Sequence, residues 1–214
     1  MITVKAFVVN YFSENTYLVY DETREAILID CGCVFPEEQK ALSDFITETG
    51  ITLKRYLCTH LHLDHTFGNE FIYNTYGLKP EAHEADVTGL PSLNTQARAF
   101  GLLLQFKDIP VEHYLVEGET IPFGHSELKV LAVPGHSPGG LSFYCEKEKF
   151  VIVGDSLFAG SVGRTDLWGG SEGILISSVH DKLFSLPNET IVYPGHGPIT
   201  SIIHEKENNI YLYQ

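Results

Sequence analysis

The segment Thr59-His60-Leu61-His62-Leu63-Asp64-His65 contains four side chains of the types that bind metal ions. His60 and His62 are two positions apart in an expected loop, so both imidazoles can point to the same side of the chain. Asp64 and His65 lie just beyond and can face a second ion. Imidazole and carboxylate are the ligands that suit zinc, iron or manganese in a hydrolytic site. The segment therefore predicts a metal centre.

Three further candidate ligands each come directly after an expected strand. His136 follows 128–133, Asp155 follows 150–153, and His196 follows 190–193. Strand ends form a rigid platform on which residues that are distant in sequence can meet. Glycine or proline lies beside each of the three, which favours tight turns that bring the backbone close to an ion. The seven residues together predict a site for two metal ions.

The segment Gly135-His136-Ser137-Pro138-Gly139 also matches the G-x-S-x-G pattern of serine hydrolases. Ser137, Asp155 and His196 even occur in the chain order of that class. Its mechanism takes an oxyanion donor from the backbone N–H of the residue after the serine. Here that residue is Pro138, which has no N–H. The sequence therefore favours metal chemistry over a serine nucleophile.

The elements that must position these residues fall into two sets. The first set has expected strands at 2–9, 16–20, 26–29 and 55–58, with helices at 36–49 and 69–76. The second has strands at 128–133, 141–145, 150–153 and 190–193, a helix through Leu175, Val179 and Leu183, and a final helix at 201–213. Residues 84–106 between the sets are expected to be mostly helical. The pattern predicts two similar αβ halves that share one sandwich.

Composition excludes several classes of protein. The chain has 214 residues and 14 Lys and Arg against 28 Asp and Glu, a formal net charge of −14. Such acidity argues against nucleic acid as a partner, because that binding relies on basic side chains. No run approaches the ~18 apolar residues of a membrane span, and no export signal is evident. We therefore expect a cytoplasmic protein with no membrane partner, folded as a single domain over residues 1–214.

These motifs resemble those of the metallo-β-lactamase fold superfamily, and within it the small glyoxalase II-like hydrolases. The resemblance covers nearly the whole chain and rests on 59–65, 135–140, 154–155, Gly-Arg-Thr-Asp at 163–166 and Pro-Gly-His-Gly-Pro at 194–198. It implies an α/β fold, a four-layer αββα sandwich. It implies a first metal on His60, His62, His136 and Asp155, and a second on Asp64, His65, His196 and a bridging Asp155.

The same resemblance implies a metal-dependent hydrolase with two divalent ions, zinc first and iron or manganese as alternatives. A hydroxide shared by the ions, oriented by Asp64, would attack a small-molecule thioester such as a 2-hydroxyacyl-glutathione. The ions leave a positive core that favours the developing oxyanion, with no acyl-enzyme. We expect no separate C-terminal helical domain of the kind that helps glyoxalase II enzymes hold glutathione. The thiol carrier and the oligomeric state stay open.

Other functions remain possible on this sequence. A persulfide dioxygenase with one iron is similar in sequence and shares the Gly-Arg-Thr-Asp segment; its metal would use His60, His136 and Asp155. Leu63, where those enzymes typically have alanine, and the complete second ligand set favour the hydrolase. Lactone or phosphoester hydrolysis on the same metal core is a further alternative. A non-catalytic metal-binding module is the last.

Two residues outside the ligand set have open or minor roles. Arg164 could bind a substrate carboxylate, because guanidinium pairs with carboxylate through two hydrogen bonds. An ion pair between Arg164 and Asp166 explains the same residues equally well. Asp30 follows the expected strand at 26–29 and is predicted to form a turn rather than to bind metal.

Overall fold

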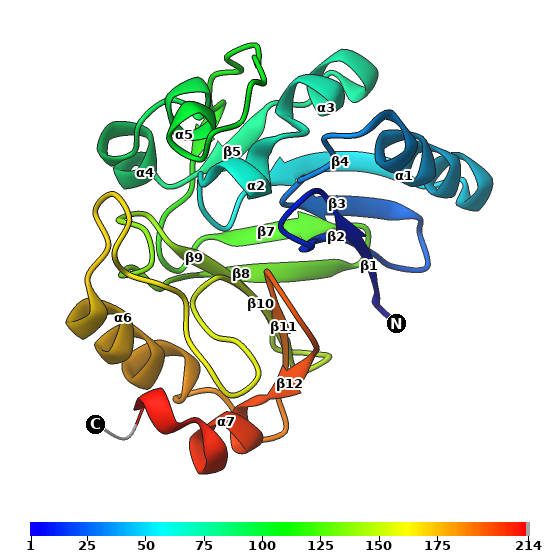
Figure 1. The fold of residues 1–214 in the computed structure, drawn as a ribbon. Coiled ribbons are helices and arrows are strands. Elements are labelled where there is room, and N and C mark those ends of the chain that lie inside the picture. Colours follow the sequence, from blue (N-terminus) through cyan, green and yellow to red (C-terminus); the bar gives the residue numbers. More distant parts are fainter. Residues whose placement is uncertain (213–214) are drawn as a thin grey trace.

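The computed structural model describes residues 1–212 and contains two six-stranded sheets packed face to face (Figure 1). The first sheet has the order β1-β2-β3-β4-β5-β6, with β1 Thr3–Val9, β2 Glu14–Tyr20, β3 Glu25–Ile29, β4 Thr52–Leu57, β5 Pro80–Ala82 and β6 His113–Tyr114. The second has the order β12-β11-β10-β9-β8-β7, with β7 Thr120–Phe123, β8 Ser126–Ala132, β9 Leu141–Cys145, β10 Phe150–Gly154, β11 Ile191–Pro194 and β12 Thr200–Ser201. Both sheets are mixed: β3 and β4 are parallel, as are β10 and β11.

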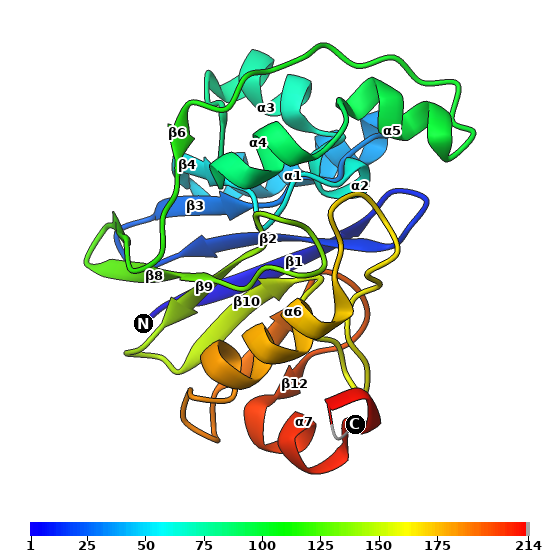
Figure 2. The same cartoon turned by 90° about the vertical axis from the view of Figure 1, so that its left-hand side faces the viewer.

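Helices cover the outer side of each sheet (Figures 1 and 2). On the side of the first sheet lie α1 Pro36–Thr49, α2 Leu63–Thr66, α3 Asn69–Tyr76, α4 Glu84–Gly89 and α5 Leu93–Ala99. On the side of the second lie α6 Glu172–Ser178, a π-helical turn Val179–Leu183, α7 Ile202–Asn208 and a 3-10 turn Ile210–Leu212. The expected αββα sandwich with two αβ halves is confirmed.

The central strands β2, β3, β9 and β10 are buried on both faces, because each sheet is covered there on both sides. In β2, Tyr17 faces the other sheet and Leu18 faces the helices, and β3 repeats this with Ile27 and Leu28. This alternation follows from the period of two in a strand. The same pattern gives three apolar layers, one between the sheets and one under the helices of each half. Both sheets are thus held rigidly enough to carry a precise site.

Strand direction gathers the candidate ligands at one end of the sandwich. The segments directly after β4, β8, β10 and β11 carry all seven of them, with Asp64 and His65 in the short helix α2. Strand β3 ends beside β4 at the same end. The opposite end carries the hairpin turns around 21–24, 124–125 and 146–149. The two ends are therefore chemically different, and the functional side chains belong to the first.

The expectation of a mostly helical 84–106 is wrong beyond Ala99. Gly101 adopts a left-handed φ of +74°, which ends α5, and 102–112 has no regular structure. Asn94 takes over the hydrogen bonds that a helix would have made: its side chain donates to Phe106 O (2.9 Å) and accepts from Phe106 N (2.8 Å). A side chain outside the segment thus decided its backbone conformation.

The final helix is also shorter than expected. α7 ends at Asn208, and Asn209 turns the chain by accepting from Tyr211 N while its amide donates to Ser161 O. Residue 213, the end of the expected helix, lies outside the described residues. None of the helices within residues 1–212 has the length and apolar character needed to cross a membrane.

Candidate metal centre

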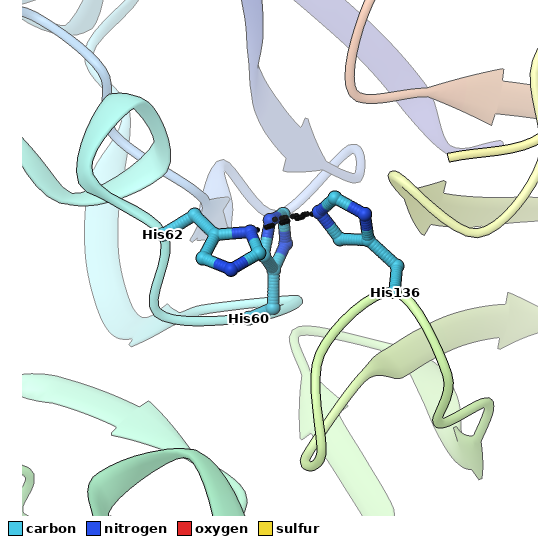
Figure 3. Close-up of side chains that lie close together, drawn as sticks. All are labelled: His60, His62 and His136. Atoms are coloured by element: carbon cyan, nitrogen blue, oxygen red, sulfur yellow. Dashed lines mark hydrogen bonds between the residues drawn. The ribbon is translucent and has the colours of Figure 1, made fainter. Parts of the chain in front are cut away.

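Three buried histidines converge from two loops (Figure 3). His62 Nδ1 lies 2.8 Å from His136 Nε2, and His136 Nε2 lies 3.2 Å from His60 Nε2. His60 and His62 come from the loop after β4, whereas His136 comes from the loop after β8. One nitrogen of each ring therefore points to a common centre.

In His136 and His60, the hydrogen bond made by the outer ring nitrogen, which faces away from the centre, fixes the state of the other nitrogen. The nitrogen that faces the centre then carries a lone pair. His136 Nδ1 lies 2.7 Å from the carbonyl oxygen of Arg164, so Nδ1 carries the hydrogen and Nε2 a lone pair. His60 Nδ1 lies 3.0 Å from Thr59 Oγ1, whose own hydrogen goes to Asp30. His60 Nε2 therefore also carries a lone pair. Two lone pairs that face each other at 3.2 Å need a cation between them.

A proton does not suit the role of the cation between these two nitrogens, because the surroundings disfavour protonated imidazole. Burial, reinforced by the neighbouring histidines, holds the pKa of His60 well below its usual value, and burial lowers the pKa of His62 to about 3. The imidazoles of His60 and His62 are consequently neutral, the form that binds metal ions. The three-histidine group fits a metal ion.

A second group, Asp64, His65 and His196, lies beside the first. His196 Nε2 is 3.1 Å from Asp64 Oδ2, and His65 Nε2 is 3.9 Å from the same oxygen. The outer nitrogens again face acceptors, Phe12 O at 3.1 Å and Asp30 Oδ2 at 2.9 Å. Both Nε2 lone pairs thus point toward carboxylates, an arrangement that a cation stabilises.

Asp155 lies between the two groups. Its Oδ1 is 3.3 Å from His65 Nε2, and its Oδ2 is 3.5 Å from His196 Nε2 and 3.7 Å from His136 Nε2. Asp155 Oδ1 and His65 Nε2 are both buried without a hydrogen-bond partner. Such orphaned atoms are rare in proteins, and an ion would satisfy both. The carboxylate of Asp155 therefore faces both groups.

Charge at this second group favours a cation as well. Burial alone would lower the pKa of His65, but Asp155, Asp30 and Asp64 raise it well above its usual value. Burial would raise the pKa of Asp155, yet His65 and His136 hold it below its usual range. The pocket therefore stabilises positive charge among these groups, which a divalent ion supplies. All seven sequence-predicted ligands meet in one place.

Glycine is required at two turns of the centre. Gly154, just before Asp155, has φ of +53°, and a Cβ there would lie 2.3 Å from Thr59 Oγ1. A Cβ at Gly195 would lie 2.2 Å from Asp155 Oδ1. Both turns therefore let the backbone come close to the ligands, as the sequence indicated.

Asp30 has a larger role than the sequence indicated. Its backbone does adopt the left-handed turn conformation, with φ of +53°. Its buried carboxylate, however, accepts from Thr59 N and Thr59 Oγ1, both at 2.7 Å, and from His65 Nδ1 at 2.9 Å. Asp30 thus orients His65 and, through Thr59, His60. The sequence did contain a signal for this role, because Asp30 is an acidic residue directly after a buried strand. That strand lies next to the one that ends at the ligands.

Asp86 is a second supporting carboxylate, and no sequence signal pointed to it. It is 1% exposed and accepts from Leu61 N at 2.9 Å, from Ser137 Oγ at 3.0 Å and from Gly139 N at 2.5 Å. It therefore ties the loop of His60 and His62 to the loop of His136. Ser137 donates to this carboxylate rather than to a histidine, which agrees with the rejection of serine chemistry.

A cavity of about 270 Å³ opens over the centre. Five of the seven predicted metal ligands line this cavity. The other lining residues are Phe12, Leu63, Phe100, Leu167 and Arg164. A larger cavity of about 360 Å³, beside α4 and α5, contains none of the seven. The candidate metal centre is thus accessible from one apolar cavity.

Comparison with known proteins places the chain in a family. Residues 9–196 match the model of the Metallo-beta-lactamase superfamily. The chain belongs to this superfamily. The probable metallo-hydrolase YqgX of Bacillus subtilis is 35% identical over 92% of the chain and 90% of its own length. The hydroxyacylglutathione hydrolase GloC of Haemophilus influenzae is 34% identical over 99% of the chain and 98% of its own length.

A dioxygenase is also among the superfamily relatives. The human mitochondrial persulfide dioxygenase ETHE1 is 31% identical over 85% of the chain, which spans 63% of ETHE1. Two solved structures are similar over nearly the whole chain. BLEG-1, a B3 metallo-beta-lactamase, has a TM-score of 0.88 at 33% identity, with 99% of the chain and 100% of its own covered. TTHA1623 in a di-iron-bound form has a TM-score of 0.86 at 37% identity, with 98% and 100% covered.

The comparisons agree with the geometry on metal binding and leave the metal open. The superfamily fold binds divalent metals, and this chain carries the His and Asp clusters for it. The di-iron form of TTHA1623 indicates that zinc is not the only metal used on this scaffold. The comparisons identify metallo-hydrolase relatives without identifying a substrate.

Proposed function

We propose that the chain is a dinuclear metal-dependent hydrolase that cleaves thioesters, with a 2-hydroxyacyl-glutathione as the reference substrate. The observation that carries the proposal is the second ligand group, Asp64, His65 and His196, complete beside the three-histidine group. The name of the relative GloC supports the substrate. Zinc is the metal we propose, and iron or manganese suits the same ligands.

In this proposal Asp155 would be a ligand in both sets. His60, His62 and His136 complete the first ligand set, and Asp64, His65 and His196 complete the second. When bound, two divalent ions lower the pKa of a shared water toward ~7 and stabilise the oxyanion of the attacked carbonyl. No side chain needs to be acylated.

The surrounding residues hold these groups in place. Asp30 and the carbonyl oxygens of Arg164 and Phe12 accept from the outer nitrogens of His65, His136 and His196, which keeps each Nε2 free to bind. Asp64 is 12% exposed at its side chain and lines the cavity, where it can orient the attacking water and accept its proton. The apolar cavity walls limit competing water around the carbonyl.

The test combines metal content with two assays on one purified sample. Metal per chain is measured by mass spectrometry, thioester cleavage by thiol release from S-lactoylglutathione, and oxygen uptake with glutathione persulfide. We expect two metals per chain and thioester turnover without oxygen uptake. Absence of turnover in the fully loaded protein would refute the proposal.

A persulfide dioxygenase is the second candidate, because ETHE1 is 31% identical to this chain. It would use one iron on His60, His136 and Asp155. One iron per chain with oxygen consumption would establish it. Lactone and phosphoester hydrolysis use the same core chemistry, so values of kcat/KM for the three ester classes on one preparation decide among them.

A further inference from the structure

The cavity over the candidate centre offers few basic side chains to a substrate. Four of its wall residues are apolar: Phe12, Leu63, Phe100 and Leu167. Apart from the histidines of the centre, Arg164 is the only basic residue in the wall. Any anionic group on a substrate, beyond the reacting carbonyl, would therefore depend on this one guanidinium.

That guanidinium is already occupied. Arg164 Nε donates to Asp166 Oδ1 at 2.7 Å and Arg164 Nη2 donates to Asp166 Oδ2 at 2.8 Å. Two parallel bonds of this kind use the face of the guanidinium that recognises carboxylates. Of the two sequence interpretations of Arg164, the structure shows the ion pair with Asp166. This exposed pair partly offsets the positive charge of Arg164 at the cavity wall.

Small thiol carriers differ in charge. An S-substituted glutathione has two carboxylates and one ammonium group, a net charge of −1, and carriers with phosphate groups are more negative. The chain has a formal net charge of −14, and two bound divalent ions would still leave it negative, so its long-range field also disfavours anions. An apolar wall whose one arginine is already paired suits a carrier without ionised groups.

Resting on the proposed thioester activity, we propose that this site prefers thioesters of uncharged carriers, and that Asp166 sets the preference by occupying Arg164. Asp166 lies outside the ligand set and does not line the cavity. It acts on specificity through its partner alone. Release of Arg164 should then add a binding site for one carboxylate of an anionic carrier.

The test uses two substrates with the same acyl group, S-lactoylglutathione and S-lactoyl-N-acetylcysteamine. We expect a higher kcat/KM for the neutral thioester in the wild-type holoenzyme. Asp166→Asn should raise kcat/KM for the glutathione thioester about fivefold, the size of one surface ion pair, and leave the neutral thioester unchanged. Arg164→Gln added to Asp166→Asn should remove that gain.

A matched control separates this effect from a change in net charge. Glu189 also forms an exposed ion pair, with Lys149, next to the opposite end of the sandwich. Glu189→Gln removes the same charge and should leave the ratio of the two kcat/KM values unchanged. An equal rise in both variants would overturn the assignment to Asp166.

A binding measurement keeps the two proposals distinguishable. Calorimetry of S-methylglutathione, which cannot be hydrolysed, should show tighter binding to Asp166→Asn than to wild type. If neither thioester is cleaved but this shift occurs, the hydrolase proposal fails, whereas the control of anionic-ligand binding by Asp166 stands. If both thioesters are cleaved and wild type prefers the glutathione form, the carrier preference is wrong and the hydrolase proposal stands.

Discussion

Two carboxylates at opposite ends of the sandwich, Asp21 and Asp155, differ in how far the protein satisfies them. At the end away from the metal centre, Asp21 accepts four hydrogen bonds, from Thr23 N (2.9 Å), Thr23 Oγ1 (2.5 Å), His125 N (2.7 Å) and Ser126 Oγ (2.9 Å). These bonds join a turn of the first sheet to a turn of the second. At the metal end, Asp155 Oδ1 and His65 Nε2 are buried with no hydrogen-bond partner.

This difference distinguishes a carboxylate that stabilises the fold from one that serves the candidate metal centre. Leaving a buried polar atom without a partner costs about 1–3 kcal/mol, so a fold avoids it unless something else supplies the partner. At the far end, the polypeptide alone satisfies the buried carboxylate of Asp21. At the metal end, the orphaned buried atoms gain partners only when ions are bound. Functional sites are the places where a sequence is expected to give up stability in this way.

Metal removal should have the largest effect and should act on one end only. Exhaustive chelation is expected to abolish thioester turnover and to lower the melting temperature, because a ligand at 1,000 times its Kd stabilises the folded state by about 4 kcal/mol. Turnover and thermal unfolding before and after chelation, and after metal is added back, measure this. Full activity of the metal-free protein would show that the metal end needs no ions.

Asp30→Asn should come next. The amide that replaces the carboxylate still fills the site but no longer accepts from Thr59 and His65 together, so His65 loses its orientation. Changes of this kind cost about 10–100-fold in metal affinity. Competition with a metal indicator gives the affinities, and unchanged values would assign Asp30 to the turn alone.

Asp86→Asn and Asp21→Asn form a matched pair across the two ends. Both carboxylates are buried and both join two loops. We expect each variant to lower the free energy of unfolding by about 1–3 kcal/mol. Only Asp86→Asn should weaken the three-histidine group, by about tenfold in metal affinity. Equal metal affinities in the two variants would remove the functional difference between the ends.

The smallest effect concerns acid stability at the far end. Burial alone would raise the pKa of Asp21, but the hydrogen bonds from Thr23, His125 and Ser126 lower it to about 2, against an ordinary value of 3.8. A lowered pKa means stabilisation that is full above pH ~4 and is lost as the pH falls toward 2, about 2 kcal/mol in all.

Urea unfolding of metal-free wild type and Asp21→Asn measures this contribution. The difference between the two free energies of unfolding should shrink between pH 4 and pH 2.5, because protonated Asp21 resembles asparagine. A constant difference over that range would contradict the lowered pKa. Chelated protein is used so that release of metal does not contribute.

Prediction from sequence succeeded where residue type and local spacing carry the signal. The strands that end at the ligands, the helix from Pro36 to Gly50 and the helix at 69–76 follow from alternation, helical spacing and end signals that lie within each segment. It failed at 100–106, where bonds from Asn94 replaced those of a helix. The supporting role of Asp86 was also missed, since its partners lie 25 and 53 positions away.

The sequence by itself determined which side chains can bind metal and that each follows a strand, because ligand chemistry and strand patterning are properties of short segments. Only the tertiary structure decided that the seven meet and which nitrogen of each histidine is free. It also decided that Asp155 lies between the two groups. These are relations between atoms on different loops, and they exist only once two sheets have fixed those loops at one end of the sandwich.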